Sequence, residues 1–151
     1  MNIFVLHANP EKAAQMLCDK HVVKMILETA QILSTVAQRG YKPTHAKHPC
    51  TLWAKESIQN WNWLCEHGIA MGKEYTARYG KVHKSIDVIQ DLIDNPPDLP
   101  NKGLTPFAQA MPDDYKCNDA VSAYRKYYIN DKKDIAVWKY SETPDWYLKA
   151  A

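Results

Sequence analysis

Four polar side chains recur along the first long helix of the chain at a spacing that could support chemistry. His21, Lys24, Glu28 and Gln31 follow one another at steps of three and four residues, so they form a single row on a helix. In a half-buried row, an imidazole, an ammonium and a carboxylate would lose water and have to satisfy one another, as active-site side chains do. The alternative is a partly exposed network in which Lys24 and Glu28 form an i,i+4 ion pair worth only a few tenths of a kcal/mol.

This polar row lies beside an apolar arc on the same predicted helix. The arc consists of Ala14, Cys18, Val22, Met25, Thr29, Leu33 and Val36. His21 and Glu28 fall close to its centre, where an ordinary amphipathic helix carries Ala or Leu. We expect the helix to begin after the cap residue Asn9 and to run to about Gln38, just before Gly40. The pattern favours an active-site face for His21, Lys24 and Glu28.

The remaining chain reads as further helices joined by polar loops. Their expected ranges are Cys50 or Thr51 to about Tyr79, about Val82 to Asp94, and Asn118 or Asp119 to about Asn130. Residues 2–6 are a short apolar run that suits either a strand or an extended arm, and the C-terminal tail is aromatic. The sequence therefore predicts an all-α fold. We expect a single domain over residues 1–151, a bundle of about four helices with N- and C-terminal arms packed on it.

Composition is that of a globular protein with an unusual set of aromatic residues. The chain has 151 residues, which suits one domain, and a net charge of +2, which does not by itself indicate a nucleic-acid binder. Five Trp and nine Tyr stand against two Phe, and Trp and Tyr favour surfaces that bind other molecules. Because neither a signal peptide nor an apolar run of ~20 residues is present, we expect a cytoplasmic monomer that does not contact membranes.

The sequence contains no motif typical of a bound cofactor. It has no phosphate-binding loop, no dinucleotide fingerprint and no serine nucleophile elbow. Cys18 with His21, and the loop containing His45, His48 and Cys50, offer zinc-type ligands, but their spacing is not standard. The four cysteines lack the dense spacing of a disulfide scaffold, so we expect reduced thiols. We accordingly expect no metal and no cofactor.

Four cationic side chains surround the predicted helix break at Gly80. They are Arg78, Lys81, His83 and Lys84. Free N–H groups at a helix start bind phosphate, and flanking cations add to this attraction. This cluster is therefore a candidate nucleic-acid contact, with an ordinary solvated turn as the alternative.

Further candidates come from the first interhelical loop, the second long helix and the tail. His45 and His48 would lie at one end of a cleft between the two long helices, where His48 could donate a proton to a leaving base. Alternatively, His48 only caps the start of the second helix. Asn60 is a polar residue on that helix's apolar arc. Trp146 and Tyr147 offer a stacking surface for bases, unless they simply cover the core.

The order of these features resembles the phage pyrimidine-dimer DNA glycosylase family (endonuclease V) and its bacterial relatives. In that family a short N-terminal arm leads into a helix with catalytic polar groups, a second long helix ends in an Arg-Gly-Tyr-like turn, and the C-terminus is aromatic and rich in lysine. The matching stretches here are Asn2-Ile3-Phe4-Val5-Leu6, Gly40-Tyr41-Lys42, His48-Pro49, Glu74-Tyr75 with Arg78-Tyr79-Gly80, and Trp138-Lys139-Tyr140 with Trp146-Tyr147.

This resemblance implies a DNA glycosylase, with or without AP-lyase activity, that acts on damaged or modified pyrimidines in DNA. The family's nucleophile is an amine that forms a Schiff base, and a helix carboxylate assists it. The resemblance thus implies Met1 as the amine and Glu28 as the carboxylate. Lys24 is the alternative amine if desolvation lowers its pKa. Amines of this type suit the role because α-amino groups ordinarily titrate near pH 8. A related DNA- or nucleotide-modification enzyme and a non-catalytic nucleic-acid- or protein-binding module are the alternatives.

Overall fold

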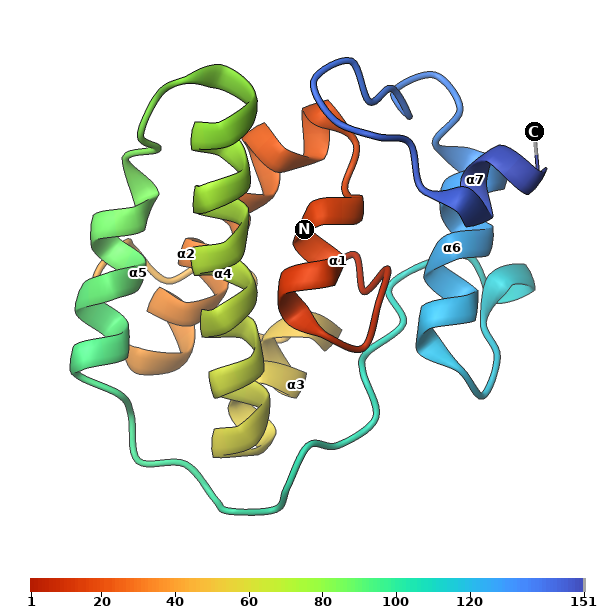
Figure 1. Cartoon of the computed structure of the whole chain (residues 1–151). Helices are drawn as coiled ribbons and strands as arrows, with labels where there is room; N and C mark the ends of the chain where they lie inside the picture. Colours follow the sequence, from red (N-terminus) through yellow and green to blue (C-terminus); the bar gives the residue numbers. More distant parts are fainter. Residues whose placement is uncertain (151) are drawn as a thin grey trace.

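The computed structural model describes residues 1–150, which form seven α-helices and one 3-10 turn with no β-strand among them (Figure 1). The elements are α1 (Pro10–Met16), α2 (Asp19–Ala37), α3 (Pro49–Glu56), α4 (Ile58–Tyr79), α5 (Ser85–Asp94), the 3-10 turn η1 (Asp113–Tyr115), α6 (Ala120–Asp131) and α7 (Asp145–Ala150). The all-α prediction is confirmed.

The first predicted helix is interrupted at Leu17 and Cys18. Both residues are extended (φ −65°, ψ 140° and φ −66°, ψ 161°), so α1 ends before them and α2 begins after them. Asn9 caps α1 as expected, because its side-chain oxygen accepts from the N–H groups of Glu11 and Lys12. The prediction of one continuous helix was wrong because the apolar periodicity passes through the break without a change of phase.

The second predicted helix is interrupted in the same way at Ser57. This residue is extended (φ −153°, ψ 146°) and separates α3 from α4. Its Oγ accepts from the N–H of Gln59 and donates to the carbonyl oxygen of Gly103 at 2.7 Å. Ser57 therefore caps α4 and ties the helix start to the long connection that follows α5. Gly80, in the left-handed region (φ 68°), ends α4 as predicted.

Helix α4 is the central element of the N-terminal part of the fold, since it contacts α1, α2, α3 and α5. Gly72 of α4 allows α5 to approach closely, because a Cβ there would lie 2.2 Å from Cδ1 of Ile86. Figure 1 shows α5 on one side of α4, with α6 and α7 on the opposite side of the molecule. Within residues 1–150, no helix is both long and apolar enough to cross a membrane.

The N-terminal arm is a buried extended segment that lies between α2 and α6. Ile3, Phe4, Val5 and Leu6 are each at most 4% exposed. The ring of Phe4 stacks on His21 of α2 and meets Tyr128 of α6 edge-on. Of the two possibilities for residues 2–6, an extended arm packed on the helices is confirmed. Burying this arm joins the C-terminal helices to the rest of the core.

Candidate active site

The first residue of the arm places an amine directly beside a carboxylate of α2. The α-amino nitrogen of Met1 lies 3.2 Å from Oε1 of Glu28, and the side chain of Glu28 is only 11% exposed. The periodicity of α2 positions Glu28 at the edge of the buried arc, and the extended arm delivers the amine to it. The two groups form an ion pair in which the carboxylate lies within reach of a proton on the amine, an arrangement that suits amine chemistry.

Asn2 fixes the position of this amine through contacts with three other segments. Its Oδ1 accepts from the N–H of Ile3 (2.7 Å) and from the Tyr124 hydroxyl (3.0 Å), with the Cys50 thiol at 3.8 Å. Its Nδ2 donates to the carbonyl oxygen of Ala110 (2.8 Å). Burial raises the pKa of Cys50 to about 11 and also raises the pKa of Tyr124, so both groups keep their protons at neutral pH.

Glu28 has one carboxylate oxygen engaged and one available. Oε2 is buried and has no hydrogen-bond partner among the described residues, while Lys24 Nζ lies 3.9 Å away. Lys24 itself is 72% exposed in its side chain. A buried acceptor without a donor is unusual in folded proteins and is a natural place for a donor on a ligand or water.

His48 is the N-cap of α3 and also lies near the amine. Its Nδ1 accepts from the N–H of Cys50 at 3.1 Å. Burial and then the nearby Met1 ammonium lower its pKa, and Glu28 acts in the opposite direction. His48 therefore caps the helix, as one of the alternatives proposed, and is a neutral imidazole beside Met1 at neutral pH. His45 is exposed next to it and contacts Thr44 Oγ1 through Nδ1 (2.8 Å).

His21 belongs to the core and is not beside Glu28, although the two share one row. Its Nδ1 lies 2.5 Å from the Tyr128 hydroxyl, and its ring stacks on Phe4 with centroids 4.2 Å apart. Burial, followed by the charges of Lys132 and Lys24, lowers its pKa to about 3. Seven residues separate His21 from Glu28, which is two helical turns. Its expected role beside the carboxylate is therefore corrected to one in packing.

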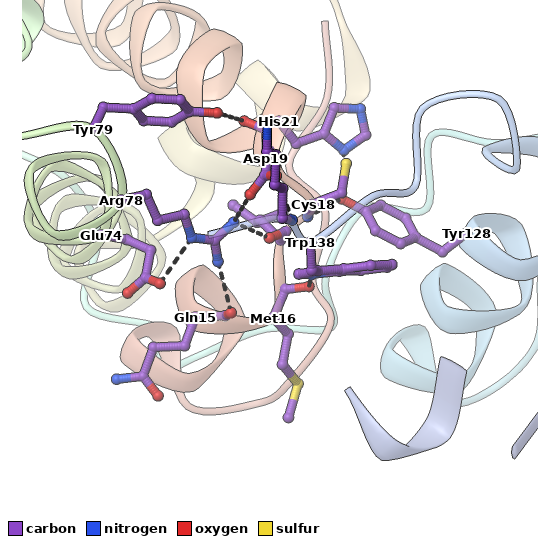
Figure 2. Close-up of polar contacts among 12 residues, drawn as sticks. Gln15, Met16, Cys18, Asp19, His21, Glu74, Arg78, Tyr79, Tyr128 and Trp138 are labelled. Atoms are coloured by element: carbon purple, nitrogen blue, oxygen red, sulfur yellow. Dashed lines mark hydrogen bonds and ion pairs between the residues drawn. The ribbon is translucent and has the colours of Figure 1, made fainter. Parts of the chain in front are cut away.

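Arg78 is buried beneath the break between α1 and α2, so its guanidinium is not accessible to a phosphate group from solvent. Figure 2 shows its guanidinium at the centre of a network of backbone and carboxylate oxygens. Its side chain is 1% exposed and lies 3.2 Å from Asp19 Oδ1 and 2.9 Å from Glu74 Oε1. It also donates to the carbonyl oxygens of Gln15 (3.0 Å) and Leu17 (2.7 Å), which the helix break leaves free. The prediction of a phosphate contact at Arg78 was wrong because these acceptors already use it.

The same Asp19 carboxylate holds the C-terminal segment. Its Oδ2 accepts from the N–H of Lys139 at 2.7 Å, and the N–H of Asp19 donates to the carbonyl oxygen of Val137. The Trp138 indole N–H donates to the carbonyl oxygen of Met16 at 3.0 Å (Figure 2). The break between α1 and α2 is thus the point where α4 and the chain after α6 are joined.

Three other predicted DNA contacts, Asn60, Trp146 and Tyr147, have partners within the fold. Asn60 is fully buried, and its amide nitrogen donates to Trp53 O (2.8 Å) and Thr105 Oγ1 (2.7 Å). The Trp146 indole N–H donates to Met16 Sδ (3.5 Å). Tyr147 packs against Trp138 with ring centroids 4.8 Å apart. A base contact at Asn60 is corrected on grounds of burial, and Trp146 and Tyr147 cover the core from α7.

The remaining cations of the predicted cluster lie on the turn between α4 and α5. Lys81 and Lys84 are exposed, and His83 Nε2 lies 3.2 Å from the carbonyl oxygen of Val23 on α2. The turn therefore borders α2, the helix that carries Glu28. All four cysteines are free thiols, and within residues 1–150 no three His, Cys, Asp or Glu side chains gather where they could hold a metal ion.

Sequence reasoning named Met1, Glu28, Lys24 and His48 as candidates, and the structure brings these four residues together at one end of the arm. It did not identify Asn2 or Tyr124, whose contacts fix the arm. The signal available for Asn2 was weak: a single polar residue at the start of an otherwise apolar run.

Comparison with curated proteins gives no match, and neither does comparison with solved structures. The family model described as pyrimidine dimer DNA glycosylase matches residues 1–88, which include the arm, α1 to α4, the α4–α5 turn and the pair of Met1 and Glu28. Because this match spans more than half of the 151 residues, the chain belongs to the pyrimidine dimer DNA glycosylase family.

Proposed function

We propose that the protein removes damaged pyrimidines from DNA through the α-amine of Met1 and then cleaves the resulting abasic site. The observation that carries this proposal is the 3.2 Å separation between the Met1 nitrogen and Glu28 Oε1. The amine is held in place by Asn2 and by a buried arm, so it is presented in one orientation to an incoming sugar.

In the first step, the neutral amine attacks C1′ of the damaged nucleotide. A bond forms between the Met1 nitrogen and C1′, and the glycosidic bond from C1′ to the base nitrogen breaks. The base leaves with the bonding electron pair and takes up a proton. Opening of the sugar ring then breaks the bond from C1′ to O4′, and O4′ is protonated. The product is a protonated Schiff base between Met1 and C1′.

In the second step, the Schiff base allows elimination. A base removes a proton from C2′, the electron pair forms the C2′–C3′ double bond, and the bond from C3′ to its phosphate oxygen breaks. The strand is cut, and water then hydrolyses the Schiff base and restores the amine. Neither step needs an oxidant or a reductant.

The surrounding side chains support these steps in distinct ways. Glu28 Oε1 accepts the proton that the ammonium must lose, and the negative charge of the carboxylate stabilises the cationic centre that develops at C1′. Its unpartnered Oε2 is available to the sugar hydroxyl that ring opening creates. His48, neutral beside Met1, is suited to accept a proton and pass it on. Lys24 lacks the desolvation that activates a nucleophilic lysine, because 72% of its side chain is exposed.

The test is capture of the Schiff base with borohydride on two DNA duplexes, one with a thymine dimer and one with an abasic site. Reduction should give a covalent adduct, and peptide mapping should place the DNA on the peptide that begins with Met1. Mapping to Lys24 would contradict the choice of amine. Absence of an adduct with both duplexes would favour the alternatives of a different modification enzyme or a non-catalytic binding module.

Glu28→Gln provides the matching variant, with Glu66→Gln on the exposed side of α4 as its control. The amide oxygen can still accept from the amine but cannot take its proton, so we expect activity to fall by roughly 10²–10³. Thermal stability should stay within about 1 kcal/mol of wild type, because the two side chains are nearly isosteric. Full activity in Glu28→Gln would remove the carboxylate from the mechanism, and global unfolding would indicate a structural role.

A further inference from the structure

The exposed stripe of α2 combines cations with aliphatic side chains and has no negative charge. It consists of Lys20, Val23, Lys24 and Leu27. Val23 is 40% exposed and Leu27 is 41% exposed, and the two are one helical turn apart. The carboxylates of α2, Asp19 and Glu28, are both buried. This face therefore offers positive charge and apolar surface together.

The stripe adjoins the proposed reactive groups. Leu27 immediately precedes Glu28, and consecutive residues of a helix point about 100° apart, so Leu27 lies at the outer edge of the face that meets the arm. Lys24 belongs to the stripe, is largely exposed and lies 3.9 Å from Glu28 Oε2, so the stripe reaches the carboxylate of the Met1–Glu28 pair.

The turn between α4 and α5 widens the cationic surface next to the stripe. His83 Nδ1 accepts from the N–H of Ser85, which leaves Nε2 to donate to the carbonyl oxygen of Val23 at 3.2 Å. This contact places the exposed Lys81 and Lys84 beside the N-terminal half of the stripe. Cations arranged around an apolar centre complement a nucleic-acid duplex, with phosphates outside and bases inside.

We propose that Leu27, supported by Val23, is a wedge that enters the DNA duplex next to the damaged nucleotide while the surrounding lysines hold the phosphates. The proposal rests on the proposed function and adds the surface by which the duplex is engaged. Enzymes that act on a base in duplex DNA must take the nucleotide out of the stack. Proteins that open a base step from the minor groove do so with side chains such as leucine. Leu27 occupies the vacated space, which keeps C1′ within reach of Met1.

The first measurement follows 2-aminopurine fluorescence in a duplex where this base neighbours a tetrahydrofuran abasic analogue, which the protein cannot cleave. Wild type should raise the fluorescence, because insertion unstacks the probe. Leu27→Ala should lose most of this rise and bind the duplex roughly tenfold more weakly, as loss of buried aliphatic surface predicts. Its affinity for the corresponding single strand, which has no stack to open, should be nearly unchanged. Leu27→Met, which keeps a long apolar side chain, should restore the signal.

The matched control is Leu104→Ala. Leu104 is also exposed (51%), but its neighbours Gly103 and Thr105 are bound to the start of α4, away from the α2 stripe. Equal losses in Leu27→Ala and Leu104→Ala, equal losses on duplex and single strand, or no fluorescence change with wild type would each overturn the wedge. Borohydride capture is scored separately: a wild-type protein that raises the fluorescence but forms no adduct would refute the amine chemistry and leave the wedge standing.

Discussion

Replacement of Arg78 by alanine should destabilise the fold strongly without removing a direct contact with DNA. Its guanidinium has four acceptors, the carboxylates of Asp19 and Glu74 and the carbonyl oxygens of Gln15 and Leu17. Alanine leaves the Asp19 carboxylate, 12% exposed in its side chain, without its cation and the two carbonyl groups without a donor. Breaking a buried pair in this way costs about 3–5 kcal/mol.

The chain contains a matched control in Arg39. It forms a two-point ion pair with Asp91, at 2.8 and 2.9 Å, but both side chains are about half exposed, at 51% and 46%. Solvent screens exposed pairs of this kind, so Arg39→Ala should leave the free energy of unfolding close to that of wild type. The contrast between the two variants compares a buried guanidinium that has four acceptors with an exposed one that binds a single carboxylate.

The assay is equilibrium unfolding in urea of wild type, Arg78→Ala, Arg78→Lys and Arg39→Ala, together with DNA binding under native conditions. Lysine keeps the charge but cannot reach four acceptors in one plane, so it should give an intermediate loss. The reasoning is refuted if Arg78→Ala unfolds within about 1 kcal/mol of wild type. It is also refuted if folded Arg78→Ala binds DNA more weakly than wild type and with a smaller salt slope, because that result would indicate a lost phosphate contact.

Three further outcomes are expected. Replacing Lys81 and Lys84 together by glutamine should weaken DNA binding and reduce its logarithmic salt slope by about 2, and an unchanged slope would make the turn ordinary solvated surface. Asn2→Ala should slow adduct formation at saturating abasic DNA more than it weakens DNA binding, because the amine loses its anchor. If the variant matched wild type in both DNA affinity and rate of adduct formation, the arm would need no such anchor. Burial lowers the pKa of His67 to about 4 from an ordinary 6.5, so the unfolded chain binds more protons between these values and stability must fall as pH decreases through that window. His67 alone should contribute about 2 kcal/mol to this loss at pH 5, and His21, whose pKa burial lowers to about 3, adds to it. The loss should therefore be smaller in His67→Gln, as followed by urea unfolding at each pH.

Periodicity predicted Glu28 and the all-α fold because both depend on local spacing. The position of Glu28 at the edge of an apolar arc is a property of α2 alone, and in the folded chain the arm places the Met1 amine beside it. Periodicity did not predict the breaks at Cys18 and Ser57, since apolar residues keep their phase across both. Each break is fixed by distant groups, the guanidinium of Arg78 and the carbonyl oxygen of Gly103.

Polar residues on an apolar arc could not be divided by sequence into catalytic and structural ones. His21, Glu28, Asn60 and Arg78 all have this pattern, yet three of them are satisfied by partners inside the fold. Glu28 differs because one of its oxygens has no hydrogen-bond partner within residues 1–150. That distinction depends on tertiary contacts of the arm and of α6, which no local pattern encodes.

The anchoring of Asn2 has a consequence for the order in which the protein matures. Its partners Ala110 and Tyr124 lie 108 and 122 residues later in the chain. During synthesis, which proceeds at about 5–20 residues per second, the first residues leave the ribosome several seconds before α6 does. Throughout that interval the amine has no fixed place beside Glu28. A chain that ends before α6 would therefore contain every residue of the family match and still lack the anchor of its amine, so the proposed chemistry requires the segment that carries Ala110 and Tyr124.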